Sequence, residues 1–341
     1  GIELTEVVPL LGRKSCMELF IHIFWTSVMP ILIMVFAGFI LDKLFTLDLR
    51  TLSKLNFFIL LPTYVFTQIY TAHLTTESIE IFFCALLILI SNSYVGVGVS
   101  KLLGYDLKKT QIIRNATMFN NGGNIGIAIA TFVFSNVPYI VNGKTPYVEV
   151  GIVAIIASFI IQTISCNTLG FYQAGVGVLT KRDALRMVFH MPVLYVAPAA
   201  VLARWIPYDL TTLMVWSPLS IFSHAFVGMA MMTLGVQMSR TPLNFIKKDV
   251  MVATALRLIG GPIIAATLML LFITLYSPVH PISAQAIIIS YSVPSAVNTA
   301  LIAFEMKNHP ELATQIVMAT TLFSAVTMPL AILFAYYLFP I

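Results

Sequence analysis

Long apolar segments recur along the whole chain, and they restrict the fold more than any other feature. Residues 79–99, 150–164 and 312–339 are three of them. An α-helix needs about 20 apolar residues to cross the hydrocarbon core of a bilayer, where it satisfies its own backbone hydrogen bonds. The alternating pattern of a membrane β-barrel is absent. The sequence therefore predicts an all-α integral membrane protein.

The composition agrees with this class. Hydrophobic residues make up 59% of the chain and charged residues 10%, whereas a soluble domain carries about 25% charged residues. The net charge of +5 comes from basic residues in particular loops, so we expect membrane lipids and no nucleic acid as partners. Cys16, Cys84 and Cys166 are widely spaced and predict neither a disulfide framework nor a metal site.

We expect ten spans joined by short connections. Their ranges are 19–41, 52–71, 79–103, 110–136, 148–174, 188–205, 214–238, 250–275, 283–306 and 312–339. Lysine and arginine are alternately abundant and scarce in successive loops. By the positive-inside rule both termini are extracytoplasmic. The expected location is the plasma membrane, as a multi-pass protein of a bacterial inner membrane.

The chain divides into two halves. Residues 1–16 lack the apolar core of a signal peptide; we expect a tail, and whether it is native stays open. Residues 17–174 then form a first five-helix repeat, 175–187 a cytoplasmic linker, and 188–341 a second five-helix repeat.

The fourth and ninth spans carry the signal of this repeat. A shift of 174 residues places Gln111 on Gln285 and Asn124 on Asn298. Because five spans is an odd number, the second copy enters the membrane from the opposite side. Inverted repeats of this kind are typical of secondary transporters.

Both matched spans contain residues that interrupt a helix near mid-membrane. The fourth span holds three asparagines and three glycines within seven residues: Asn120, Asn121, Gly122, Gly123, Asn124 and Gly126. Glycine costs a helix about 1 kcal/mol relative to alanine, and asparagine competes for backbone hydrogen bonds. Pro294 in the ninth span removes a backbone donor. We therefore expect both helices to be broken, at Gly122, Gly123 and Pro294.

The two breaks predict a substrate site. The helical halves that follow them start at mid-membrane, so both positive N-termini face the break. The candidate substrate-binding residues are Asn120, Asn121, Asn124, Pro294, Ser295, Asn298 and Thr299. All fourteen acidic residues fall in loops or near span ends, so a cationic substrate would lack a counter-charge. A small organic anion is the expected ligand.

The coupling ion stays open between H⁺ and Na⁺, and no cofactor is expected. His22 and His224 are the candidate proton carriers, and backbone carbonyls freed at the breaks are the candidate sodium ligands. The simpler alternative is that these small and polar residues serve helix packing alone. Arg114 and Arg257 are expected to extend their side chains to the cytoplasmic side.

Four segments resemble the auxin efflux carrier family, which contains plant auxin exporters and bacterial permeases of malate or malonate, within a bile-acid and auxin carrier-like superfamily. They are NNGGNIGIA (120–128), TLGVQM (233–238), VPSAVNTALIAFEM (293–306) and LATQIVMATTLFSAVTMPL (312–330). The resemblance implies ten helices in two inverted repeats, with helices 4 and 9 crossing at their breaks. It also implies a scaffold of helices 1, 2, 6 and 7, a transport domain of helices 3–5 and 8–10 that moves as an elevator, and a homodimer.

The family's substrate-carboxylate role falls here on Asn120, Asn121, Asn124 and Asn298. The chain departs from the plant carriers by having Gly-Gly at the first break, where they have proline, and by lacking their long central loop. A small mono- or dicarboxylate is therefore a better expectation than auxin.

Two other functions remain open. A sodium-coupled symporter of bile-acid type would bind Na⁺ at the same breaks. Sodium dependence of substrate binding distinguishes this hypothesis from the organic anion carrier. A ligand sensor with a carrier fold would need an attached signalling domain. A membrane enzyme is not expected, because no catalytic constellation gathers at one depth.

Overall fold

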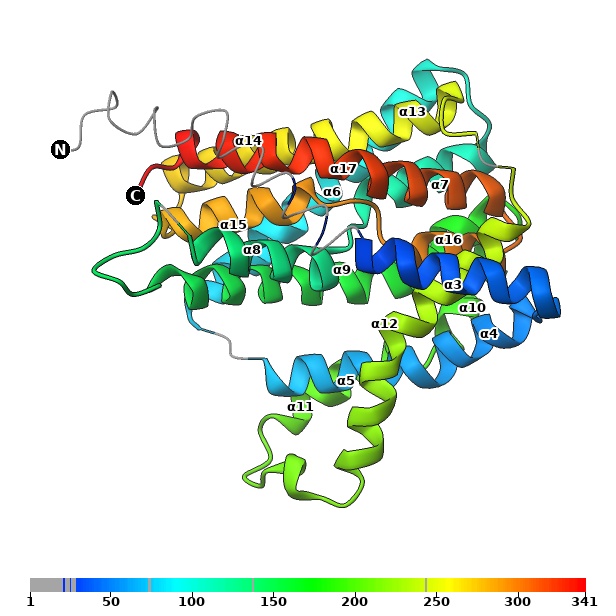
Figure 1. Cartoon of the computed structure of the whole chain (residues 1–341), viewed down its shortest axis with the longest axis horizontal. Coiled ribbons are helices and arrows are strands. Elements are labelled where there is room, and N and C mark those ends of the chain that lie inside the picture. Colours follow the sequence, from blue (N-terminus) through cyan, green and yellow to red (C-terminus); the bar gives the residue numbers. More distant parts are fainter. Residues whose placement is uncertain (1–20, 22–24, 26–28, 73–74, 137, 243) are drawn as a thin grey trace.

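The computed structural model describes residues 21, 25, 29–72, 75–136, 138–242 and 244–341. The named elements of this part of the chain are all helices, so the predicted all-α class is confirmed (Figure 1). The predicted tail, 1–16, and the candidate proton carrier His22 lie outside the described residues.

Five helical segments of the described chain are long and apolar enough to cross a membrane. They are α6 (Glu77–Leu102), α9 (Tyr147–Val176), α12 (Trp216–Ser239), the continuous segment Lys248–Leu275 and α17 (Pro310–Leu338). A sixth candidate is the pair α10 (Lys181–Phe189) and α11 (Val193–Ala203), which meet at an angle of 44°. This content indicates a multi-pass membrane protein.

The other predicted spans are not among these candidates: the fourth and ninth are interrupted, the first begins beside residues that are not described, and the second is helical throughout residues 49–71. Their elements are α3 (Met29–Phe45), α4 (Leu49–Leu55), η2 (Asn56–Leu60), α5 (Leu61–Thr71), α7 (Leu107–Met118), η3 (Gly122–Gly126), α8 (Ile127–Phe134), α15 (Pro281–Ser292) and α16 (Val297–Glu305). The number of ten spans thus stays a prediction.

Prolines explain two of the irregular turns. The π-helical turn η2 ends two residues before Pro62, and the π-helical turn η5 (Leu256–Gly260) ends two residues before Pro262. Proline has no N–H and its ring clashes with the carbonyl four residues earlier, and a π turn is one way for a helix to accommodate the strain. The segment Lys248–Leu275 therefore consists of α13 (Lys248–Ala255), η5 and α14 (Gly261–Leu275).

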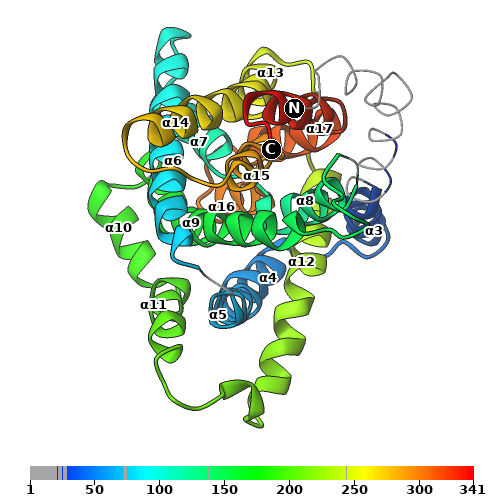
Figure 2. The same cartoon turned by 90° about the vertical axis from the view of Figure 1, so that its left-hand side faces the viewer.

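The helices form two packed groups. In the first, α15 is the most enclosed element: every residue from Ile282 to Ser292 is buried, and α9, α14 and α17 pack around it (Figure 2). In the second group α12 packs against α3 and α5, and α5 packs against α11. The second group extends away from the first at the α11–α12 end, where the 3₁₀ turn η4 (Leu210–Thr212) lies in the connection (Figure 1).

Two glycines allow α3 and α12 to cross in backbone contact. A Cβ atom at Gly235 of α12 would lie 1.9 Å from the Val35 carbonyl oxygen, and one at Gly38 of α3 would lie 2.0 Å from the Met232 carbonyl oxygen. Small residues are the usual means by which membrane helices approach this closely.

We predict that Gly235→Ala separates α3 from α12 and lowers the free energy of unfolding by about 1–3 kcal/mol, the typical cost of overpacking. Gly228→Ala is the matched control, because it lies on the same helix and a Cβ there meets no atom within 4 Å. Thermal denaturation in detergent measures both. Equal melting temperatures for the two variants would contradict the close crossing.

Candidate functional site

The chain leaves the helical conformation at residues 119–121 and 293–296, and the two breaks pair with each other. Of the predicted break residues, Pro294 lies in the second break, whereas Gly122 and Gly123 follow the first and lie within η3 (Gly122–Gly126). The first lies between α7 and η3, the second between α15 and α16. Asn120 and Ser295 form an antiparallel bridge. The amide of Asn121 donates to the Pro294 carbonyl (2.9 Å), and the amide of Ala296 donates to the Phe119 carbonyl (3.0 Å). Each break thus supplies backbone partners for the other.

Side chains satisfy the carbonyl groups that each helix leaves unpaired at its C-terminal end. The Ser295 hydroxyl donates to the Ala116 carbonyl at 2.7 Å. The Arg257 guanidinium donates from one nitrogen to the Thr117 carbonyl at 2.7 Å and from the other to the Tyr291 carbonyl. Both broken helices therefore end on hydrogen bonds from distant parts of the chain.

The expectation that Arg257 extends to the cytoplasmic side is wrong. Its side chain is fully buried, and two helix C-termini meet around it. Helix C-termini carry a partial negative charge and attract cations, which gives the arginine a partner inside the protein. Arg114, by contrast, is half-buried and donates from Nε to the Ser93 hydroxyl at 2.7 Å.

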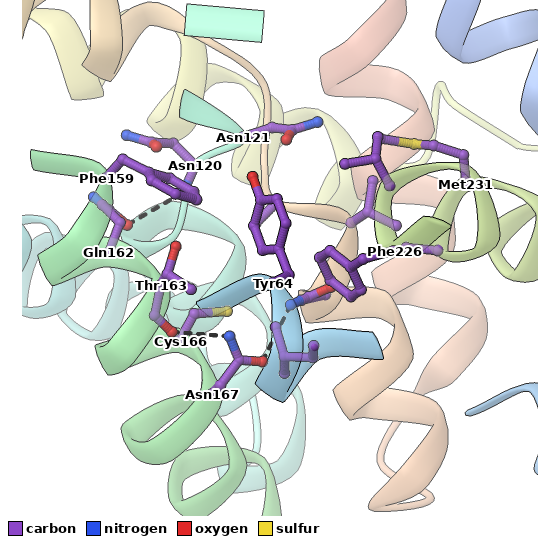
Figure 3. Close-up of a pocket in the computed structure, with 16 residues that line it drawn as sticks. Tyr64, Asn120, Asn121, Phe159, Gln162, Thr163, Cys166, Asn167, Phe226 and Met231 are labelled. Atoms are coloured by element: carbon purple, nitrogen blue, oxygen red, sulfur yellow. Dashed lines mark hydrogen bonds between the residues drawn. The ribbon is translucent and has the colours of Figure 1, made fainter. Parts of the chain in front are cut away.

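A cavity of about 50 Å³ lies beside the paired breaks (Figure 3). One wall comes from α5 and α12, with Tyr64, Phe226 and Met231, and the opposite wall comes from α9 and the breaks. The lining residues in the described part of the chain are Leu61, Tyr64, Asn120, Asn121, Phe159, Gln162, Thr163, Cys166, Asn167, Phe226, Val227, Ala230, Met231, Ala296, Val297 and Asn298. Every one of these lining side chains is neutral at pH 7.

Three of the predicted site residues meet at this cavity: Asn120, Asn121 and Asn298. The side-chain oxygen of Asn120 accepts from the Gly122 amide at 3.0 Å, while its Nδ2 has no hydrogen-bond partner among the described residues although it is buried. The side-chain nitrogen of Asn298 donates to Asn167 Oδ1 at 3.1 Å.

Helix α16 begins at the cavity. Its N-cap residue Ala296 and its first residues, Val297 and Asn298, line the cavity, and no side chain caps this end of the helix. Backbone N–H groups in the first turn of a helix have no partner within that helix, and they carry the positive end of the dipole. This end therefore offers hydrogen-bond donors to an anion.

Three other predicted residues are not part of the described cavity lining. Pro294, Ser295 and Thr299 are buried beside it, and the hydroxyls of Ser295 and Thr299 donate to backbone carbonyls. The backbone of Gly123 and Asn124 lies within η3, but the position of the Asn124 side chain is outside the described part of the structure.

His224, the second candidate proton carrier, is exposed on α12, and its Nδ1 lies 2.6 Å from the carbonyl oxygen of Ser220. It does not belong to the cavity lining.

Sequence reasoning missed the contribution of α9. Gln162, Thr163 and Asn167 line the cavity from this helix, and Gln162 Oε1 accepts from the Asn120 amide at 3.4 Å. Their spacing places them on one side of a helix. Polar residues that share one face of an apolar span indicate that this face lines a site, and this pattern could have been found in the sequence. The opposite wall contains Tyr64 and Phe226, whose rings lie 4.9 Å apart. No local sequence pattern predicted that these two aromatic residues line the cavity.

Two comparisons with known proteins agree with this architecture. Residues 184–332 match the family described as "Membrane transport protein". The matched segment comprises 149 of the 341 residues. The predicted resemblance to auxin efflux carriers is thereby confirmed.

One relative spans almost the whole chain. It is a protein of Methanothermobacter thermautotrophicus named as an uncharacterized transporter, 23% identical over 311 residues, which cover 89% of this chain and 96% of the relative. The match to the transport family and this name indicate a membrane transporter, not an enzyme.

The hydroxyl of Ser295 has a structural role that can be tested separately from ligand binding. We predict that Ser295→Ala lowers the free energy of unfolding by about 1–3 kcal/mol, because the buried Ala116 carbonyl loses its donor. Ser324→Ala is the control: Ser324 is equally buried, but its hydroxyl bonds the Thr321 carbonyl within its own helix. Chemical or thermal denaturation of both variants measures the difference, and a larger loss for Ser324→Ala would refute this role.

Proposed function

We propose that the protein is a secondary transporter of small organic anions, mono- or dicarboxylates of the malate or malonate type. The carboxylate would bind in the cavity beside the paired breaks. The observation that carries the proposal is the uncapped start of α16, which lies at the cavity beside the buried Asn120. The Nδ2 of Asn120 is a second donor near this end and has no hydrogen-bond partner among the described residues. A carboxylate accepts hydrogen bonds from both kinds of donor.

The charge of the cavity favours an anion over a cation. Among the described residues, the lining carries amide, hydroxyl and aromatic groups and no acidic side chain. A cation inside a membrane protein needs a carboxylate or a set of carbonyls as a counter-charge. The carbonyl ends of the broken helices already accept hydrogen bonds from Ser295 and Arg257.

The cavity must open before a whole substrate enters. Its volume of about 50 Å³ is about a third of that of a 150 Å³ cavity known to hold benzene. Because its walls belong to two different helix groups, we propose that they separate by an elevator-type movement. The scaffold would contain α3, α4, α5, α11 and α12; the transport domain would contain the paired breaks, α6, α9, α14, α15 and α17.

Polar contacts join these two groups in the present structure. Glu305, at the end of α16, accepts a hydrogen bond from the Ser53 hydroxyl (2.9 Å) and pairs with Lys54 of α4. Gln237 of α12 donates from Nε2 to the Ala300 carbonyl (3.0 Å). In the proposed mechanism these bonds break when the transport domain moves.

The proposal includes the wider architecture predicted from the sequence: ten spans in two inverted repeats, extracytoplasmic termini, a plasma-membrane location and a homodimer formed through the scaffold. The coupling ion is H⁺ or Na⁺, and His22 and His224 remain the candidate proton carriers. No cofactor enters the proposal.

The test is a thermal-shift screen of the purified protein with mono- and dicarboxylates, followed by uptake of the best ligand into proteoliposomes. We predict saturable stabilisation of the wild type by at least one carboxylate. Asn120→Asp should abolish this effect, because it places a negative charge where the ligand carboxylate would bind.

Asn136→Asp is the matched control, since Asn136 is exposed at the end of α8 and makes only a local bond to the Phe132 carbonyl. It should retain the stabilisation. If no carboxylate stabilises the wild type, or if Asn120→Asp responds as the wild type does, the anion site is wrong.

A further inference from the structure

Arg257 lies deep in its helix. It is nine residues from Lys248, at the start of the segment Lys248–Leu275, which corresponds to about 14 Å of helix and so to about the middle of the hydrocarbon core. It is fully buried. None of the ion pairs in the described part of the chain includes it. A charge at this depth is costly, and residues of this kind usually mark function.

The two carbonyls that bind Arg257 are equivalent in the proposed repeat. The shift of 174 residues that relates the fourth and ninth spans places Thr117 on Tyr291. Each is the second-to-last residue of its helix, α7 or α15. One guanidinium thus binds the same carbonyl position in both halves.

The charges at the crossing can be added from the helix dipoles. Each helix C-terminus carries about half a negative charge and each N-terminus about half a positive charge. The C-terminal ends of α7 and α15 together amount to about one negative charge, which the guanidinium matches. The N-terminal ends of the following segments, η3 and α16, remain, with about one positive charge in total. One carboxylate matches that remainder.

The surroundings are shaped to hold the arginine. A Cβ atom at Gly261 would lie 2.4 Å from an Arg257 terminal nitrogen and 2.6 Å from the Tyr291 carbonyl oxygen, so only glycine leaves room there. The guanidinium carbon also lies 5.8 Å from the centre of the Tyr291 ring. That ring is fixed in turn, because its hydroxyl donates to the Ala85 carbonyl at 2.9 Å.

We propose that Arg257 is a positioning residue that acts as a fixed internal cation. It holds the carbonyl ends of both broken helices together and takes the place that a coupling sodium ion would otherwise occupy there. The crossing then binds one carboxylate without sodium. The part concerning carboxylate rests on the proposed function; the part concerning sodium and the two helix ends does not.

Arginine suits this position better than lysine. Its planar guanidinium presents donors in two directions at once, whereas an ammonium group is a compact point charge that is more strongly hydrated. The separate nitrogens that bind Thr117 and Tyr291 use this geometry. We therefore expect Arg257→Lys to keep the charge while weakening the link between the helices.

The first experiment needs no ligand. The melting temperature of the wild type is measured in sodium, potassium or N-methylglucamine chloride at one ionic strength, and the same values within error are expected. Arg257→Ala should melt several degrees lower and recover in millimolar guanidinium but not in equal concentrations of N-methylglucamine. Arg114→Ala, the control at a half-buried arginine bound to Ser93, should show no such recovery.

Three outcomes would overturn the proposal. They are sodium-specific stabilisation of the wild type, an Arg257→Ala variant as stable as the wild type, and equal guanidinium recovery in both arginine variants. If Arg257→Ala does not fold, Arg257→Lys and the sodium comparison on the wild type still decide the question.

The second experiment measures carboxylate affinity with the anion found in the thermal-shift screen. The dissociation constant of the wild type should be the same in sodium and in N-methylglucamine. Arg257→Lys should bind within a few-fold of the wild type, and Arg257→Gln, which keeps a donor but loses the charge, should bind at least about tenfold more weakly. Unchanged carboxylate affinity in Arg257→Gln would refute the proposed role of the positive charge of Arg257. A wild type that binds no carboxylate would remove the proposed function while the ligand-free result on sodium still stands.

Discussion

The structure depends on one constraint, which is that a helix broken inside a membrane must find new partners for its backbone polar groups. Water cannot supply them in hydrocarbon, and each unsatisfied group costs several kcal/mol. Here the two breaks satisfy each other through Asn121 to Pro294 and Ala296 to Phe119. Neither break is stable alone in this environment. Each break therefore requires the other, although the two segments lie some 174 residues apart in sequence.

The pairing also separates the two kinds of helix end. Carbonyl ends gather around Arg257, and the start of α16 lies at the cavity with Asn120 and Asn298. The separation produces a site of hydrogen-bond donors whose described lining contains no acidic side chain. Because the cavity lies between two helix groups, a movement of one group against the other would expose it on either side of the membrane. The architecture that stabilises the breaks is thus the same one that we propose for transport.

The sequence predicted what is determined locally. The glycine and asparagine cluster and Pro294 place both breaks, because propensity and proline geometry act within a few residues. It could not predict the walls from α5 and α12 or the face of α9, since these depend on which helices pack together. Arg257 was misassigned for the same reason: a side chain that extends to the membrane surface and one that binds two distant helix ends look identical in sequence. Ser295 was expected to bind ligand, yet its hydroxyl bonds the Ala116 carbonyl.

The most direct test of the account is a structure of the protein with a bromine-substituted small carboxylate, in which the anomalous signal locates the ligand. The account predicts the carboxylate oxygens within about 3.2 Å of Asn120 Nδ2 and of the first amides of α16, with Arg257 still bound to the carbonyls of Thr117 and Tyr291. A ligand bound directly to Arg257, or one bound away from Asn120 and α16, would contradict it.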